Sequence, residues 1–402
     1  MRSFDTTMEV ITPLFLGGAD PRGKPELRPA SFRGALRFWW RAVFGGAIGE
    51  DLDAMRSAET AVFGSNEKGS SLVVRLAPVG SVSSEDFTKH RAIRRPGAHP
   101  QPTGRDYLFW SMASTGRRER GNYQPPHQYI TPGARFKLRL QARPGAPNGE
   151  VALQEATAAL WLLVHLGALG SRSRRCAGSL VVASEPTPLS SDLPLVFSVP
   201  EDPRQLKTQL EEGLHNIIDA LGARHTQNRH SALPAFDVLR AGNCRIWVVS
   251  GRRAWRDGAD AVEAMGAALR DFRSAENAGR ADHNAVLEWF EHRRRPTTIQ
   301  RTAFGLPIPF RYSRGGPSDT IQAGAHDGAM WDRRASPLCM RVSRLAGGGH
   351  IGVIVLFKSA FLATGGELKL RNKGWMTDPP PDYSFVERFV TGQFPHRWEV
   401  QL

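Results

Sequence analysis

Apolar positions recur with two different periods in the first half of the chain. In segment 135–141, Phe136, Leu138 and Leu140 alternate with charged residues, which is the pattern of a strand with one buried face. The Ala- and Leu-rich segment 151–169 predicts a helix instead. The complete set for this half comprises strands over 7–16, 71–77, 135–141 and 178–183, a helix from Pro29 to Gly45-Gly46, and a helix over 151–169.

These elements follow one another as strand, helix, strand, strand, helix, strand. This is the order of the ferredoxin-like split βαβ fold, which RNA-recognition modules share. Residues 79–133, between the second and third strands, are basic and punctuated by Pro and Gly. Loops of this length are usually binding elements or linkers. We therefore predict an α+β fold with a long basic insertion.

The second half of the chain has less regular patterns. Strands are predicted over 193–199, 245–249, 339–343 and 351–357, and helices over 201–221, 260–272 and 383–390. These elements would suit a decorated second copy of the same fold. The sequence contains no repeat that proves a duplication.

The first predicted helix carries the most informative pattern of the chain. Arg33, Arg37 and Arg41 recur at i, i+4 and i+8, so they lie one above another on a single face. Like charges at this spacing repel each other by a few tenths of a kcal/mol per pair. The ladder therefore weakens its own helix unless an anion neutralises it. The alternative is a basic face that is simply solvated.

The other side of this helix has the spacing of a stripe that faces a core. The stripe comprises Phe32, Leu36, Trp39 or Trp40, and Val43. The adjacent tryptophans project about 100° apart on a helix. One is expected in the core, and the other could pack in the core too or support the arginines by cation–π contact.

A second basic segment, Gly170 to Ser179, connects the second helix to the fourth strand. It contains Arg172, Arg174 and Arg175 among small residues. Small residues let a backbone approach a ligand closely, and arginines bind phosphate through two parallel hydrogen bonds. The alternative is an ordinary turn after a helix, with exposed arginines.

Charge strengthens the interpretation of both segments as anion sites. The chain has 402 residues, 53 Lys and Arg against 39 Asp and Glu, and a net charge of +14. Such an excess favours nucleic acid as a partner over an anionic membrane surface. No apolar run reaches the length that spans a bilayer, and the N-terminal residues lack the apolar core of a signal peptide. We expect a cytoplasmic protein without a membrane partner.

Other chemistry is weakly indicated. Cys176, Cys244 and Cys339 lie too far apart for a zinc or disulfide pattern. His225 and His230 have no acidic partner at metal-ligand spacing, and His350 has no visible catalytic partner. No carboxylate cluster, Walker motif or dinucleotide fingerprint is present. We expect no metal and no cofactor.

Several of these segments resemble a known family. Segment 12–20 and segment 27–41 are similar to the opening of RAMP-superfamily subunits of the type III-B CRISPR Cmr effector complex, the first of those subunits in particular. Segments 170–175, 304–307 and 335–338 also resemble that family. One departure is Cys176-Ala177, where the family often has glycine.

The resemblance implies tandem ferredoxin-like domains with long insertions, over 1–187 and 188–402. It implies an RNA-binding subunit without catalytic activity, placed toward the 3′ end of the CRISPR guide RNA beside another RAMP subunit. There it would help hold guide and target RNA, while a repeated backbone subunit cleaves the target. The residues expected to contact RNA are Arg28, Arg33, Arg37, Arg41, Arg172, Arg174 and Arg175.

Two alternatives remain open from the sequence. Some proteins that share this fold are metal-independent endoribonucleases that process guide RNA, with a histidine as acid or base. In the other alternative, the arginines bind acidic faces of neighbouring subunits, and the chain is mainly a protein–protein cap. Holding RNA and docking a subunit can coexist.

Overall fold

A computed structural model describes most of the chain. The described residues are 3–93, 100–184, 193–222, 233–274, 276–294, 296, 299–311, 318–325, 330–331, 333–362, 366–371, 374–377 and 383–402. His225, His230 and the predicted domain boundary at 187 and 188 lie outside them. The boundary therefore stays a prediction.

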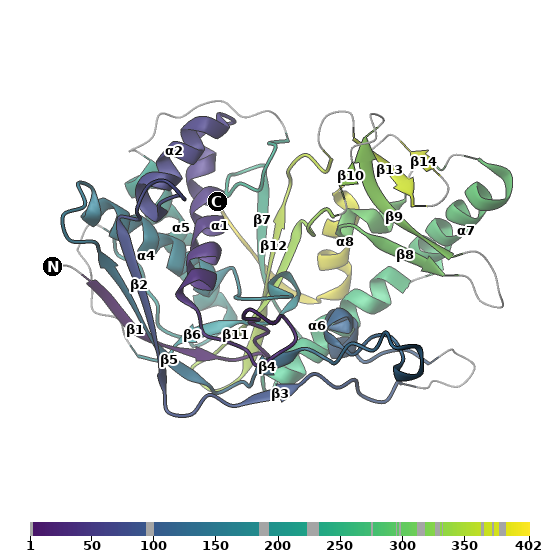
Figure 1. Ribbon diagram of the computed structural model, residues 1–402, viewed down its shortest axis with the longest axis horizontal. Helices are drawn as coiled ribbons and strands as arrows, with labels where there is room; N and C mark the ends of the chain where they lie inside the picture. Colours follow the sequence, from purple (N-terminus) through teal and green to yellow (C-terminus); the bar gives the residue numbers. More distant parts are fainter. Residues whose placement is uncertain are drawn as a thin grey trace.

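The first half forms a four-stranded antiparallel sheet with the order β2-β5-β1-β6. Its strands are β1 (Ser3–Val10), β2 (Leu72–Val79), β5 (Arg135–Ala142) and β6 (Leu180–Val182). Helices α1 (Pro29–Ile48) and α4 (Gly149–His165) pack against each other and cover one face (Figure 1). In β5, Phe136, Leu138 and Leu140 are buried and the charged residues between them are exposed. The predicted ferredoxin-like arrangement is confirmed.

The second half repeats this topology. Strands β7 (Cys244–Ser250), β11 (Leu338–Arg344), β12 (His350–Phe357) and β15 (His396–Val400) form an antiparallel sheet with the order β11-β12-β7-β15. Helix α6 (Gly258–Ser274) follows the first strand and α8 (Ser384–Gln393) precedes the last. The succession and the sheet order therefore match those of the first half. The chain is a tandem of ferredoxin-like units.

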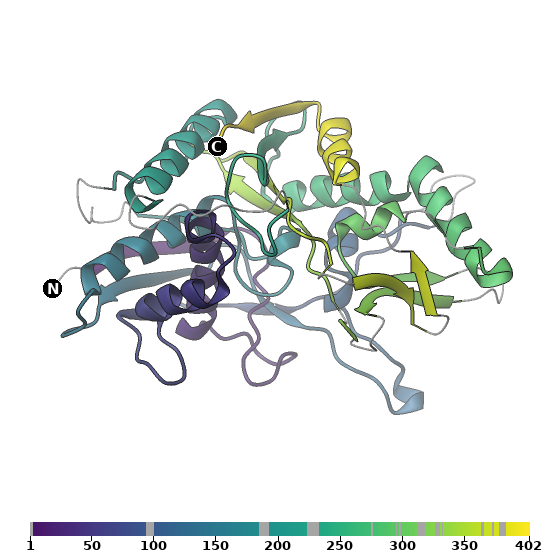
Figure 2. The same cartoon turned by 90° about the horizontal axis from the view of Figure 1, so that it is seen from above.

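Additional elements decorate both units. Helix α7 (Glu276–His292) and a small sheet of β8 (Ile308–Arg311), β9 (Ser318–Ala325), β10 (Met330–Trp331), β13 (Gly366–Leu370) and β14 (Gly374–Thr377) extend the second unit on the right of Figure 1. Helix α5 (Pro203–Gly222) links the halves and lies beside α4 and β15 (Figure 2).

The basic insertion of the first unit has its own structure. It contains β3 (Ser84–Asp86) paired with β4 (Gln128–Ile130), the short helix α3 (Gly104–Leu108), and the one-turn helices η1 (Trp110–Met112) and η2 (Arg118–Arg120). Helix α3 packs closely on α6 of the second unit. A Cβ atom on Gly104 would lie 2.0 Å from the Glu263 carbonyl oxygen. The insertion therefore joins the two units.

Three predictions about elements need correction. Residues 193–199 form no strand; this segment instead supplies main-chain acceptors, since the Val196 carbonyl accepts bonds from Trp161 and Gln209. The first strand ends at Val10, before the predicted residue 16. Helix α1 continues through Gly45-Gly46 to Ile48. The lack of a side chain at Gly45 leaves room for the Phe236 ring, which a Cβ atom there would approach to 2.4 Å.

One continuous apolar core connects the two units. Trp39 of α1 and Phe357 of β12 have ring centroids 6.2 Å apart, and both are buried with Ile246 and Val353 of the second sheet. Each unit therefore buries part of its apolar surface against the other.

His165, the last residue of α4, lies inside this core. Its ring contacts those of Trp161 and Phe197, with centroids 4.6 Å and 6.2 Å away. Burial, reinforced by the charge of Arg341, lowers the pKa of His165 to about 3. The imidazole is therefore neutral in the folded protein, whereas it becomes protonated below about pH 6.5 in the unfolded chain.

This difference predicts a pH-dependent stability. The unfolded state takes up a proton as the pH falls below about 6.5, whereas the folded state does not. The free energy of unfolding therefore decreases as the pH falls. Between pH 7.5 and pH 5, the wild type should lose about 2 kcal/mol more than His165→Phe. Urea unfolding of both proteins at several pH values measures this difference. If the free energy of unfolding falls equally with pH in the wild type and in His165→Phe, the assignment of a neutral His165 in the folded protein is contradicted.

Candidate nucleic-acid interface

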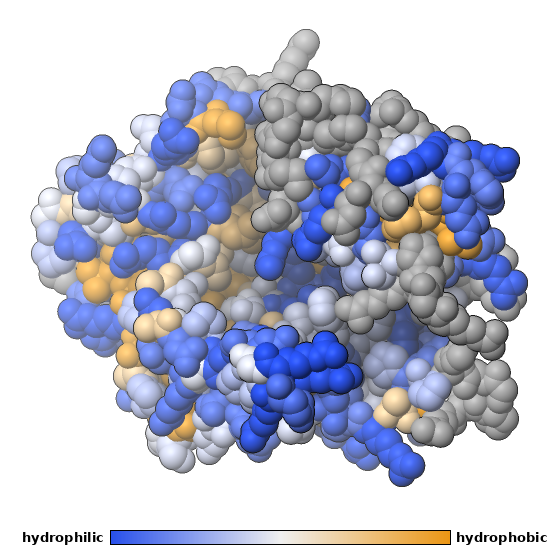
Figure 3. All heavy atoms as spheres, turned by 45° about the vertical axis from the view of Figure 1, so that its right-hand side comes forward, coloured by the Kyte–Doolittle hydropathy of each residue, from blue (hydrophilic) through white to orange (hydrophobic). Residues whose placement is uncertain are grey.

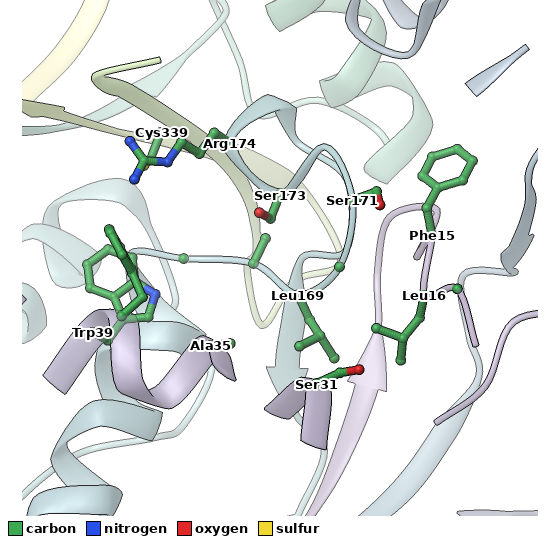
Figure 4. A pocket seen from close by; sticks show the side chains of 15 residues that line it. Phe15, Leu16, Ser31, Ala35, Trp39, Leu169, Ser171, Ser173, Arg174 and Cys339 are labelled. Carbon is green, nitrogen blue, oxygen red and sulfur yellow. The ribbon is translucent and has the colours of Figure 1, made fainter. Parts of the chain in front are cut away.

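A pocket lies between the exposed side of α1 and the loop that precedes β6. Its volume is about 500 Å³, and Ser31, Ala35 and Phe38 line one wall. The opposite wall is the loop from Gly167 to Arg174, with Phe15 and Leu16 at the end (Figure 4). The predicted helix and the second basic segment are therefore neighbours in space.

The arginine ladder borders the same exposed side of α1. Arg41 and Arg28 are exposed, and Arg33 and Arg37 are half-buried. Gly34 lies on this side as well, and a Cβ atom there would have no heavy atom within 4 Å. The helix thus presents an open strip between basic side chains and the pocket.

Glu59 of α2 (Leu52–Phe63) partly neutralises the ladder. Its carboxylate lies 3.3 Å from Nε of Arg37 and 3.2 Å from Nη1 of Arg41. Arg37 also donates to the carbonyls of Phe63 and Gly64 at the end of α2. One carboxylate for two guanidinium groups leaves this part of the ladder positive.

Arg33 remains without a carboxylate among the described residues. Its Nε is buried and has no hydrogen-bond partner in that part of the chain. Burial and the charges of Arg37 and Arg143 lower the pKa of Arg33. Three guanidinium groups therefore converge at this end of α1, an arrangement that favours a bound anion.

The three arginines of the loop point into the protein. Nε of Arg172 donates to the Leu108 carbonyl at 2.7 Å. Arg174 forms an ion pair of 2.9 Å with the buried Asp237. Arg175 donates to the carbonyls of Leu338 and Phe304 at 3.0 Å and 3.1 Å. These guanidinium groups are engaged in joining distant segments of the chain.

Burial has a clear electrostatic consequence for two of them. It lowers the pKa of Arg172 to about 10, with a further contribution from Arg273. Burial together with Arg172 and Arg273 lowers the pKa of Arg175 to about 9. Both groups stay protonated at neutral pH, but a buried cation stabilises the fold only through the carbonyls that accept its protons.

The loop backbone is held in an uncommon conformation. Arg172 and Cys176 have φ of 62° and 66°, in the left-handed region that glycine adopts most readily. This explains in physical terms why glycine suits position 176. At Gly178, a Cβ atom would lie 1.9 Å from the Leu169 carbonyl oxygen, so the loop closes on itself without room for a side chain.

Both tryptophans of α1 belong to the core. Trp39 and Trp40 are 3% and 1% exposed. The Trp40 indole donates to Glu155 at 2.8 Å and stacks on Phe44 at 4.6 Å. Among the described residues, no cation–π pair joins the ladder to Trp39 or Trp40; Arg37 instead faces the Phe63 ring at 5.9 Å.

The described residues contain no group of three His, Cys, Asp or Glu side chains that could hold a metal ion. His350 is 8% exposed, and its backbone pairs with Trp255. Burial and Arg344 lower the pKa of His350. The three cysteines are buried free thiols. In the described part of the chain, no helix is long and apolar enough to cross a membrane.

The sequence did not identify two residues of this interface. Glu59 lies on α2, a helix that was not predicted, although Met55, Val62 and Phe63 have helical spacing. Arg143 follows β5 and approaches Arg33 only through the folding of the sheet. The spacing of residues along the chain does not indicate that Arg143 lies near Arg33.

Comparison with known proteins places these features in a family. Residues 7–181 match the model of the RAMP superfamily. The CRISPR system Cmr subunit Cmr1-1 of Pyrococcus furiosus is 27% identical over 88% of this chain and 87% of its own length. Cmr subunit Cmr1-2 of the same organism is 33% identical over 44% of this chain and 92% of its own length.

Solved structures share the fold over the whole chain. The crystal structure of apo Cmr1 from Pyrococcus furiosus superposes with a TM-score of 0.61 and 21% identity, covering 100% of this chain and 99% of that one. A chain in the cryo-EM structure of the type III-B Cmr-beta complex bound to cognate target RNA has a TM-score of 0.52 and 12% identity, with 98% of both chains covered. This chain therefore belongs to the RAMP superfamily, among the Cmr1 subunits of the type III-B CRISPR Cmr complex.

Proposed function

We propose that this chain is an RNA-binding structural subunit of a CRISPR RNA-guided ribonucleoprotein that targets RNA. It caps the 3′ end of the guide RNA and helps hold guide and target beside other RAMP subunits, without a catalytic role of its own. The observation that carries the proposal is the exposed side of α1. There, Arg33 lacks a carboxylate partner among the described residues and Arg41 shares one.

The geometry divides the seven predicted RNA contacts into two groups. Arg28, Arg33, Arg37 and Arg41 border the open side of α1 and are the residues we assign to RNA phosphates. Arg172, Arg174 and Arg175 are occupied by main-chain carbonyls and Asp237. Their contribution to RNA binding is to hold the loop wall of the pocket in place.

The known relatives support the choice of ligand. The similar Cmr-beta complex is described as bound to cognate target RNA. A net charge of +14 is consistent with such a partner. The guide-processing endoribonuclease alternative gains no support from His350, because that residue is buried and its backbone pairs with Trp255.

A salt titration tests the assignment to phosphates. We expect Arg33→Gln/Arg41→Gln to reduce the log–log salt dependence of single-stranded RNA binding by about 1.4, because two phosphate contacts are lost. Fluorescence anisotropy of the full chain between low and moderate salt measures the slope. The control is Arg256→Gln, whose side chain is 79% exposed on the second unit. Equal slopes for wild type and the double variant would refute the assignment.

Gly34 provides a test in which stability and binding change in opposite directions. Alanine is favoured over glycine inside a helix by about 1 kcal/mol, and Gly34 has open space around it. Gly34→Ala should therefore raise the unfolding temperature, yet weaken RNA binding because a methyl group stands where the RNA approaches.

Gly392→Ala on α8 is the matched control. Its glycine also has no heavy atom within 4 Å of an added Cβ, and it should stabilise without changing RNA affinity. Thermal unfolding and anisotropy on the same preparations give both readouts. If Gly34→Ala binds RNA as tightly as wild type, RNA does not contact this strip of α1.

A further inference from the structure

A second cluster of rings and arginines lies at the seam between the insertion and the second unit. Trp110, on η1 of the insertion, is 55% exposed. It lines a cavity of about 370 Å³ together with His283 of α7, Arg301 of η4 (Gln300–Phe304), and Pro309 and Phe310 of β8. The guanidinium carbon of Arg301 lies 4.5 Å from the Phe310 ring centroid. An exposed indole therefore lies beside a cavity that an arginine and an aromatic ring also line.

Positive charge accumulates behind this cavity. Arg273, in the last turn of α6, lies between the rings of Tyr107 and Phe304, 5.9 Å and 5.6 Å from their centroids. Its Nε is buried without a hydrogen-bond partner, and no carboxylate of the described residues lies within ion-pair distance of it. The Nε atom of this guanidinium group therefore has no acceptor among the described residues.

The neighbours of Arg273 are also cations. Its charge contributes to lowering the pKa of Arg172, Arg175 and Arg301, after the larger effect of burial. The ion pair that Arg301 makes with Asp282, at 3.4 Å, provides the counter-charge. Four guanidinium groups with one paired carboxylate give the seam a local excess of positive charge, which an anion would relieve.

We propose that this seam, hereafter the Trp110 site, holds one nucleotide of a single-stranded RNA, with the base against Trp110 and the phosphate at Arg301, where Arg273 adds a second positive charge. Ring faces accept any base by stacking, and arginines supply the electrostatic part. The inference rests on the proposed function for the identity of the ligand, but it concerns residues far along the chain from α1.

The surrounding surface suits an RNA strand. The insertion exposes Arg117, Arg118 and Arg120 around η2, and Arg118 lies over the Tyr123 ring at 4.9 Å. In Figure 3, strongly hydrophilic side chains gather at the lower middle of the face, and the surface is hollowed above them. An RNA strand that reaches η2 would meet these basic side chains outside the Trp110 site too.

The experiment compares variants of the full chain binding a single-stranded RNA oligonucleotide. Trp110→Ala should weaken binding about tenfold with an unchanged salt slope, because a stacking contact is lost. Arg301→Gln should reduce the salt slope by about 0.7, because the phosphate contact at Arg301 is lost. Trp110→Phe, which keeps a ring, should retain most of the affinity, and Val151→Ala, an exposed apolar control on α4, should bind as the wild type does.

Crosslinking gives an independent readout of the same site. RNA carrying 5-iodouridine should crosslink to Trp110, and mass spectrometry should locate the adduct. Adenosine monophosphate in excess distinguishes the sources of the ligand: competition that abolishes the crosslink would show a site for free nucleotides and overturn the assignment to an RNA strand. Persistence of the crosslink supports that assignment.

Failure here is separable from failure of the proposed function. Unchanged RNA affinity in both Trp110→Ala and Arg301→Gln, with a reduced slope in the α1 double variant, would overturn the Trp110 site and leave the α1 assignment standing. Normal RNA binding combined with loss of assembly into the complex would show that the Trp110 site docks a protein, which also overturns the proposal.

Discussion

Buried guanidinium groups that bind main-chain carbonyls hold the two ferredoxin-like units together. Arg175 reaches from the first unit to carbonyls at Phe304 and Leu338, and Arg341 reaches back from β11 to the carbonyl of Leu180 at 3.0 Å. A buried cation is costly unless each donor finds an acceptor. These contacts therefore tolerate few alternative arrangements of the two units, whereas apolar packing alone would tolerate more.

The consequence for α1 is a fixed environment on both sides. Its apolar stripe, including Trp39, packs into the core that both units share, and its exposed side faces the loop that the buried arginines hold. A rigid helix beside a rigid loop is a suitable support for binding, because little conformational freedom is lost when a ligand arrives. The positive charge of the ladder can then serve binding, since Glu59 neutralises only part of it.

Arginine thus has two distinct uses in this chain. Where carbonyls or a buried carboxylate from distant segments surround the guanidinium, as at Arg174 and Arg175, the side chain is part of the fold. Where acceptors are missing among the described residues, as at Arg33 and Arg273, the charge remains available. The surplus of positive charge over the whole chain is consistent with a polyanionic partner.

The sequence by itself determined the first ferredoxin-like unit, because strand alternation and the helical stripe of α1 are local periodicities that survive in any context. It also determined that arginines dominate two particular segments. The duplication was decided only by tertiary structure, since long insertions separate the strands of the second unit and its core requires apolar residues of no particular identity.

Whether each guanidinium group has partners within the protein was likewise decided only by the folded chain. The acceptors of Arg175 lie 129 and 163 residues away in sequence, and Glu59 lies on a helix that the pattern did not reveal. Whether a guanidinium group is free or occupied depends on such distant partners, and the spacing of residues along the chain does not indicate them.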